Sequence, residues 1–174
     1  MTETDRIILT DDDEVPDPFG GVYAYWMEKR GQAWAPLLSD FRLDELESRI
    51  LPWSIIVDVN PNPLEFIYRF WGSQRTALIG AEMTGKKLSE IPNAYMREGN
   101  IKEYLEVYKL KKPLLCNTPV TTKPGSEVMF QSIRLPLTDD ENDVSHIYSA
   151  INYKQISAAH YEYYGTNPKA ANQL

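Results

Sequence analysis

The chain has 174 residues, 43 % of them hydrophobic and 11 % aromatic, and is therefore long enough to bury one substantial core. A formal net charge of −7 disfavours nucleic acid, whose phosphate backbone requires clustered lysine and arginine. No stretch approaches the ~18 apolar residues of a membrane-spanning helix, and a lone cysteine, Cys116, suits a reducing compartment. We therefore expect a cytoplasmic domain that binds neither nucleic acid nor a membrane.

The N-terminal third is predicted to consist of a flexible acidic segment followed by a helical extension. Residues 1–18 are acidic and contain prolines, which favours a flexible, solvated segment. In the extension, residues 19–52, aromatic side chains recur at helical spacing, and a second short helix is expected over 43–50. The aromatic face must be covered, and we expect Tyr25 and Trp26 to form a homodimer interface. The alternative is that this helix packs on the sheet of its own chain.

Residues 53–155 show the alternation and turn chemistry of an antiparallel sheet domain. Two β-branched and aromatic runs are joined by an Asn- and Pro-rich turn, and a helix of several turns and three further strands follow. The strand candidates are "SIIVDV", "EFIYRFW", "LLCNTPVTT", "EVMFQSIRLPL" and "VSHIYSAINY". This order predicts an α+β fold with a five-stranded antiparallel sheet and helices on one face. Residues 156–174 are expected to form a polar C-terminal tail.

Three segments carry a family resemblance through their order along the chain. They are "YAYWMEKRG", "LPWSIIVDVN" and "FIYRFWGSQRTALIGAEMTGKKLSEI". Together they resemble a bacterial PAS-like family of stand-alone domains with a Tyr-Trp helix ahead of the sheet, over about Val22 to Tyr153. The resemblance implies short helices wrapped over the sheet around a small cavity, with Gly72, Gly80 and Gly85 at the corners. The glycine spacing matches neither phosphate-loop motif.

The candidate chemical groups favour structural roles. Cys116 falls in a predicted strand, so we expect a buried cysteine rather than a thiol that attacks a flavin. The only histidines, His146 and His160, are expected on a strand surface and in the tail rather than as haem ligands. Asp58 interrupts an apolar strand and can pair across the hairpin with Arg69. We expect no catalytic residue, cofactor or metal.

Strand parity suggests a ligand site. In the fourth strand Met129, Gln131 and Ile133 alternate with the neighbouring set, and we expect the Met129 set to face the cavity. Two polar groups, Gln131 and Ser149, would orient a small apolar or monocarboxylate ligand, or else bond to each other with no ligand. The predicted site residues are Phe70, Leu78, Tyr104, Cys116, Met129, Gln131, Ile133, Ser149 and Ile151.

Three arginines lie close to the predicted sheet. Arg69, Arg75 and Arg134 could clamp a carboxylate ligand through bidentate hydrogen bonds. Each could instead pair with a local acid or cover apolar surface with its long stem, which is the reading we favour from the sequence.

These observations favour a non-enzymatic sensory or regulatory module that binds a small organic ligand or an unidentified protein partner. One alternative is an interaction module with a filled core that forms a homodimer without a ligand. The other is a small isomerase or dehydratase on a cone-like α+β fold, and the scarcity of histidine argues against it.

Overall fold

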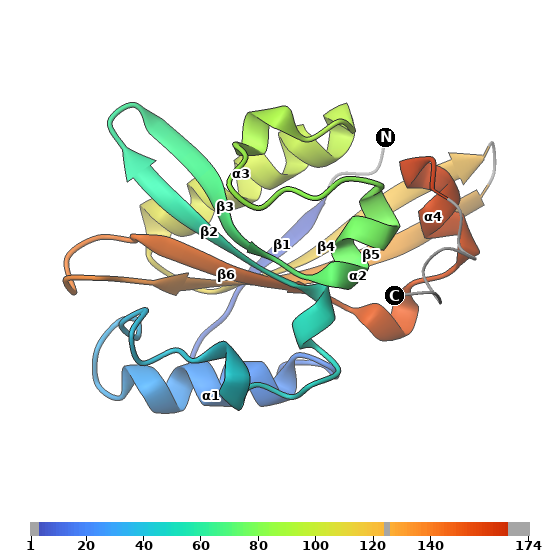
Figure 1. Cartoon of the computed structure of the whole chain (residues 1–174). Helices are drawn as coiled ribbons and strands as arrows, with labels where there is room; N and C mark the ends of the chain where they lie inside the picture. Colours follow the sequence, from blue (N-terminus) through green and yellow to red (C-terminus); the bar gives the residue numbers. More distant parts are fainter. Residues whose placement is uncertain (1–3, 124–125, 167–174) are drawn as a thin grey trace.

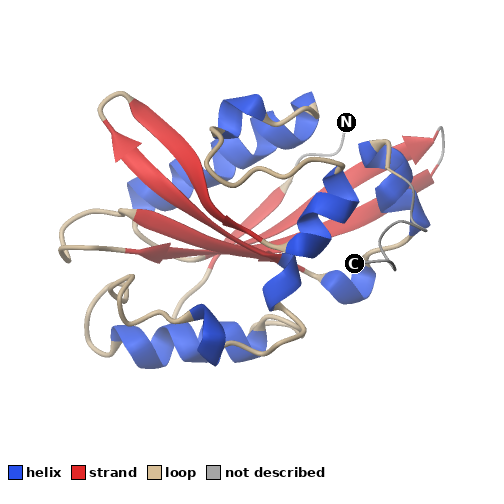
Figure 2. Ribbon diagram, viewed as in Figure 1, coloured by secondary structure: helices blue, strands red, loops and turns tan. Residues whose placement is uncertain are grey.

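The computed structural model describes residues 4–123 and 126–166. One antiparallel sheet of six strands, in the order β1-β4-β5-β6-β2-β3, runs through the centre of the molecule. Helix α1 lies against one face of this sheet, and α2, α3 and α4 lie on the other (Figure 1 and Figure 2). Within the described residues, no helix is both long and apolar enough to cross a bilayer.

The strands are β1 (Asp5–Ile8), β2 (Ser54–Pro61), β3 (Leu64–Trp71), β4 (Leu114–Lys123), β5 (Ser126–Leu137) and β6 (His146–Ile151). The helices are α1 (Gly20–Arg30), α2 (Ser73–Ile79), α3 (Ala94–Leu110) and α4 (Ala158–Tyr164). The predicted α+β class, hairpin, long helix and three late strands are confirmed.

The sheet has one strand more than predicted, because part of the segment expected to be flexible joins it. Strand β1 pairs antiparallel with β4, from Asp5 opposite Asn117 to Ile8 opposite Leu114. Leu9 follows, is buried, and donates its backbone N–H to the carbonyl of Pro113 at 2.9 Å. The apolar run from Ile7 to Leu9 thus outweighs the acidic composition around it.

Helix α1, the predicted N-terminal helical extension, packs on the sheet of its own chain, on the face opposite α2, α3 and α4. Trp26 is 2 % exposed, and its indole N–H donates to the carbonyl of Pro136 at 2.8 Å. Tyr25 is half-buried and donates its hydroxyl to Glu45 at 2.7 Å. The aromatic face is therefore covered within the chain, and the reasoning that assigned Tyr25 and Trp26 to a homodimer interface does not hold.

The second predicted helix, over 43–50, is absent from the described chain. Only a 3₁₀ turn, Leu43–Glu45, forms there, and another turn of this kind, Leu51–Trp53, precedes β2. Leu46 and Ile50 are buried in the core on the α1 side of the sheet. Anchoring these two side chains outweighs the helix propensity of the segment.

A β-bulge in the first hairpin sets the direction of several side chains. Ile56 lies opposite Phe70 and Val57 opposite Tyr68, so Arg69 is the extra residue in β3. The bulge lets Tyr68 and Trp71 both enter the core beneath α2 and α3, and their rings lie 4.8 Å apart. Phe70 joins the opposite core on the α1 side.

Helix α4 docks on the sheet where a polar tail was expected. His160 is 2 % exposed and accepts the backbone N–H of Ser157 at Nδ1, 3.1 Å away. Its Nε2–H donates to the carbonyl of Met129 on β5 at 3.1 Å. The two bonds require the neutral tautomer with the proton on Nε2, because Nδ1 acts as the acceptor.

Gly72 joins β3 to α2 at a point of close approach. A Cβ at this position would lie 2.2 Å from the carbonyl oxygen of Pro52. Its φ of −63° is open to any residue, so the glycine is needed for space and not for a left-handed backbone. Gly80 and Gly85 do have positive φ, 75° and 79°, as corner residues require.

We expect Gly72→Ala to lower the free energy of unfolding by about 1–3 kcal/mol, because the added methyl group must push two backbone segments apart. Urea denaturation measures the change. The matched control is Gly21→Ala in α1, where an added Cβ meets no atom within 4 Å, and its stability should be unchanged or higher. Equal losses in the two variants would contradict the packing argument.

The docking of α4 should weaken in acid. Burial holds the pKa of His160 below its ordinary value of 6.5, although the bond to Met129 opposes this shift. A histidine with a lowered folded-state pKa contributes stability above the unfolded pKa, and this contribution falls as the pH drops towards the folded value. The stability difference between the parent and His160→Gln should therefore shrink between about pH 7.5 and about pH 5.5. A difference independent of pH would refute this assignment.

Candidate ligand pocket

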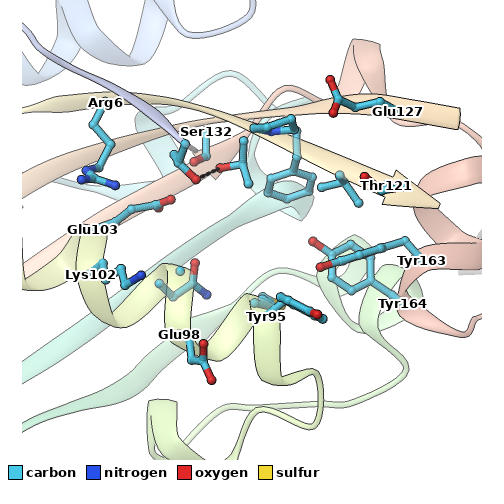
Figure 3. A pocket seen from close by; sticks show the side chains of 18 of the residues that line it. Arg6, Tyr95, Glu98, Lys102, Glu103, Thr121, Glu127, Ser132, Tyr163 and Tyr164 are labelled. Atoms are coloured by element: carbon cyan, nitrogen blue, oxygen red, sulfur yellow. Dashed lines mark hydrogen bonds between the residues drawn. The ribbon is translucent and has the colours of Figure 1, made fainter. Parts of the chain in front are cut away.

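A pocket of about 320 Å³ lies between α3, strands β4 and β5, and α4. Figure 3 shows α3 side chains on one side of it, strand side chains on the other and two tyrosines of α4 closing one end. The labelled groups on these walls are Tyr95, Glu98, Lys102 and Glu103 from α3, Arg6, Thr121, Glu127 and Ser132 from the strands, and Tyr163 and Tyr164 from α4.

The apolar part of the pocket is built around Phe130. The ring of Phe130 meets the ring of Tyr164 edge to face, with centroids 6.1 Å apart. Met96, Pro119 and Val120 also line the pocket, and Val120 is buried. These side chains form a surface suited to the apolar body of a small molecule.

One end of the pocket carries a buried ion pair. Arg134 of β5 is 1 % exposed and donates Nη2–H and Nε–H to Glu103 of α3 at 2.6 and 2.9 Å. A third bond, from Nη2 to the Oδ1 of Asn100, measures 2.8 Å, and all three residues line the pocket. Two hydrogen bonds to one carboxylate, with an amide beside them, are the arrangement that a desolvated ion pair requires.

A second buried arginine, Arg75, comes from α2, which packs against α4. It is 1 % exposed, and its Cζ atom lies 5.6 Å from the ring centroid of Trp71. Burial, together with the positive charge of Arg134, lowers the pKa of Arg75 to about 10. Neither its Nε nor its Nη1 has a hydrogen-bond partner among the described residues.

Three more polar atoms in this region are buried without a partner in the described part of the chain: the hydroxyl of Tyr68, Nε1 of Trp71 and Nδ2 of Asn100. Burial raises the pKa of the Tyr68 hydroxyl well above its ordinary value, while the nearby Asn100 side chain acts in the opposite direction. The hydroxyl and the amide are thus neighbours, but they do not meet with hydrogen-bond geometry. We call Tyr68, Trp71, Arg75 and Asn100 the buried donor cluster.

The parity prediction for β5 is wrong. Phe130, Ser132 and Arg134 line the pocket, while Met129, at 44 % exposure, lies on the surface. Gln131 faces away from the pocket, donating to Asn117 at 2.8 Å and accepting from Asn152 at 2.9 Å. Gln131 is thus a structural hydrogen-bonding group and does not meet Ser149.

The other predicted site residues divide between the two faces of the sheet. Phe70 and Ile133 belong to the core on the α1 side. Five lie on the same face as the pocket but are packed into the core beside it without lining it: Leu78, Tyr104, Cys116, Ser149 and Ile151. Ser149 donates its hydroxyl to the hydroxyl of Tyr104 at 3.4 Å, near the Arg134 ion pair.

Sequence reasoning missed Asn100, Glu103 and Tyr164, although the signals were present. Glu103 and Tyr104 follow Asn100 by three and four residues on one helix face, so polar groups interrupt the buried stripe of α3. In α4, His160 and Tyr164 have the i, i+4 spacing of a buried face, and Ser157 caps the helix. The tyrosine-rich composition of this segment concealed that spacing.

Cys116 is buried in β4 as predicted, and burial raises the pKa of its thiol. The predicted pair between Asp58 and Arg69 is confirmed at 2.6 Å. His146 was expected on a strand surface but is 4 % exposed, with its ring nitrogens 2.7 Å from Asp58 and 2.9 Å from Asp139. The described residues contain no cluster of histidine, cysteine and acidic side chains that could hold a metal ion.

Comparison with known proteins identifies the fold family. Curated proteins give no sequence match. Among solved structures, the chain resembles one described as the structure of an RNA-binding Light-Oxygen-Voltage receptor, with a TM-score of 0.42 and 9 % sequence identity. That comparison covers 100 % of this chain and 44 % of the other, so the chain spans less than half the length of that structure. A family model described as PAS domain matches residues 17–152, which is most of the chain, and the chain therefore belongs to the PAS domain family.

Proposed function

We propose that this PAS domain is a non-enzymatic sensory or regulatory module that binds a small organic ligand in the pocket between α3, β4, β5 and α4. The pocket carries this proposal. Its volume of about 320 Å³ falls at the lower end of the range for small-molecule sites, and an aromatic wall faces buried charges at one end. Membership of the PAS family supports a sensory role.

Helix α4 can transmit ligand binding in the pocket to a protein partner. It supplies Tyr163 and Tyr164 to the pocket wall, and it is joined to β6 by a short turn at Tyr153–Gln155. It packs against the rest of the domain through Tyr161, which is buried, and Thr166, two residues beyond its end, donates its hydroxyl to the carbonyl of Leu78 at 2.7 Å. A ligand that touches both tyrosines stabilises the docked position of α4, and a protein partner that contacts α4 can then read this position.

Gly99→Leu provides the test. Gly99 lines the pocket from α3, and a Cβ at this position meets no atom within 4 Å, so a larger side chain fills the pocket without a clash at its root. The probes are octanoate, benzoate and phenylacetate together with their uncharged primary amides. Compounds that raise the Tm of the parent should no longer do so in Gly99→Leu. The unliganded variant should be more stable by roughly 0.5–1 kcal/mol, because glycine is a poor helix former.

The control for this experiment is Gly21→Leu in α1, on the opposite face of the sheet. An added Cβ at Gly21 also meets no atom within 4 Å, so the two variants make the same change without a clash, one in the interior of α3 and one in the first turn of α1. Gly21→Leu should keep the full ligand-induced shift in Tm. The proposal fails if no probe raises the Tm of the parent, or if Gly99→Leu responds as the parent does.

A further inference from the structure

The buried charges on the pocket side of the sheet do not balance. Arg75 and Arg134 are the buried guanidinium groups of the described chain, and Glu103 is the one buried carboxylate, which leaves an excess of one positive charge. Glu103 directs its Oε2 to two nitrogens of Arg134, so it is already engaged. Because an unpaired buried charge is costly, Arg75 lacks the anion that its position calls for.

The unpaired polar atoms point to the same conclusion independently. The five atoms in the described residues that are buried without a partner all belong to the buried donor cluster, and each carries an N–H or O–H hydrogen. They come from β3, α2 and α3. Unpaired buried donors are rare in folded proteins, and several of them gathered around a cation form the complement of an anion.

Turning over the Asn100 amide does not satisfy the cluster. The Oδ1 of Asn100 accepts from Arg134 at 2.8 Å, so flipping the amide would place two donors against each other and leave that bond unmade. The indole of Trp71 has a donor only, and the cation–π contact of Arg75 with the Trp71 ring uses the face of the guanidinium rather than its N–H groups.

The cluster is adjacent to the pocket. Asn100 belongs to the cluster and also lines the pocket, beside Arg134 and Tyr164. Arg75 does not line the pocket itself, but it belongs to α2, which packs against α4, the helix that carries Tyr164. A molecule with an apolar body against Phe130 can thus direct a polar end towards the cluster.

We propose that the ligand of this pocket is an organic monocarboxylate whose carboxylate binds the buried donor cluster, with Arg75 as its principal partner. This inference rests on the proposed function. The charge count selects a monoanion, because a single negative charge neutralises the excess while a phosphate dianion would reverse its sign. The fork of N–H donors on arginine matches the two oxygens of a carboxylate, and the tyrosine, indole and amide donors complete the shell.

The experiment compares each acid with its uncharged amide on the full chain, in the parent and in Arg75→Met, by calorimetry and by the shift in Tm. The parent should bind octanoate, benzoate or phenylacetate about tenfold or more tightly than the matching amide. Arg75→Met should lose this preference, with the affinity for the amide little changed. Without a ligand, Arg75→Met should be as stable as the parent or more so, since it removes an unpaired buried charge.

A second variant keeps the test decisive if Arg75→Met fails to fold. Asn100→Asp supplies a carboxylate within the buried donor cluster from the chain itself, so the unliganded protein should gain Tm and the preference for acids should disappear. Asn60→Asp, on an exposed residue at the end of β2, is the matched control and should change neither property.

The outcomes separate the two proposals. If acids and amides bind equally and Gly99→Leu abolishes both, the pocket binds small molecules and the carboxylate inference is wrong. If chloride stabilises the parent as strongly as the organic acids do, the cluster takes a small inorganic anion, which also overturns the inference. If no probe binds the parent, both proposals fall. If Arg75→Met lowers the Tm in the absence of acids, the donors of Arg75 are already met by water, which overturns the carboxylate inference.

Discussion

The ion pair between Arg134 and Glu103 is the constraint around which the pocket side of the domain is arranged. It joins the middle of β5 to α3 in a region from which water is excluded, with both side chains almost fully buried. Removing one partner of such a pair leaves an uncompensated charge and costs about 3–5 kcal/mol, so the two elements are held in one relative position. Asn100 and Tyr104, one turn apart on α3, are tied to the same guanidinium. Because Glu103 pairs with Arg134, no other buried carboxylate in the described chain is left for Arg75.

The bulge at Arg69 is the second determinant of the site. In a regular strand Tyr68 and Trp71 would face opposite sides, since side chains alternate with a period of two. The extra residue brings both into one core and sends Phe70 into the other. Arg69 itself remains half-exposed, where Asp58 neutralises it. The bulge thus leaves Arg69 at the surface, where it pairs with Asp58, and places Tyr68 and Trp71 in the core, where the Trp71 ring contacts the buried Arg75.

The elements of the fold were predictable from the sequence, whereas the faces of the strands were not. The first hairpin, α3 and the three late strands follow from apolar period and turn residues, which are local properties. Parity along β5 depends on which face of the sheet meets helices, and here α1 covers one face while α2, α3 and α4 cover the other. The side chains from Ser132 to Leu137 and all those of β6 are consequently buried. The alternation of apolar and polar residues along these strands therefore does not show which side chains face the pocket and which face α1. Met129 was assigned to the cavity for that reason, although it lies on the surface.

The three arginines considered in the sequence show why residue type alone cannot assign a role. Arg69 stands on a strand with Asp58 on the neighbouring strand, and Arg134 meets Glu103 across the gap between sheet and helix, so both pair with acids as the sequence favoured. Arg75 lies on a seven-residue helix, and its two unpaired nitrogens are enclosed with aromatic and amide donors. Arg75 differs from the other two arginines because it is buried and because Glu103 already pairs with Arg134. Both are properties of the folded domain. Such an arrangement suits a sensory domain, because the site is electrostatically incomplete within the chain and a ligand of matching charge completes it. Binding of that ligand then stabilises the fold, and a ligand whose charge matches the site better stabilises it more.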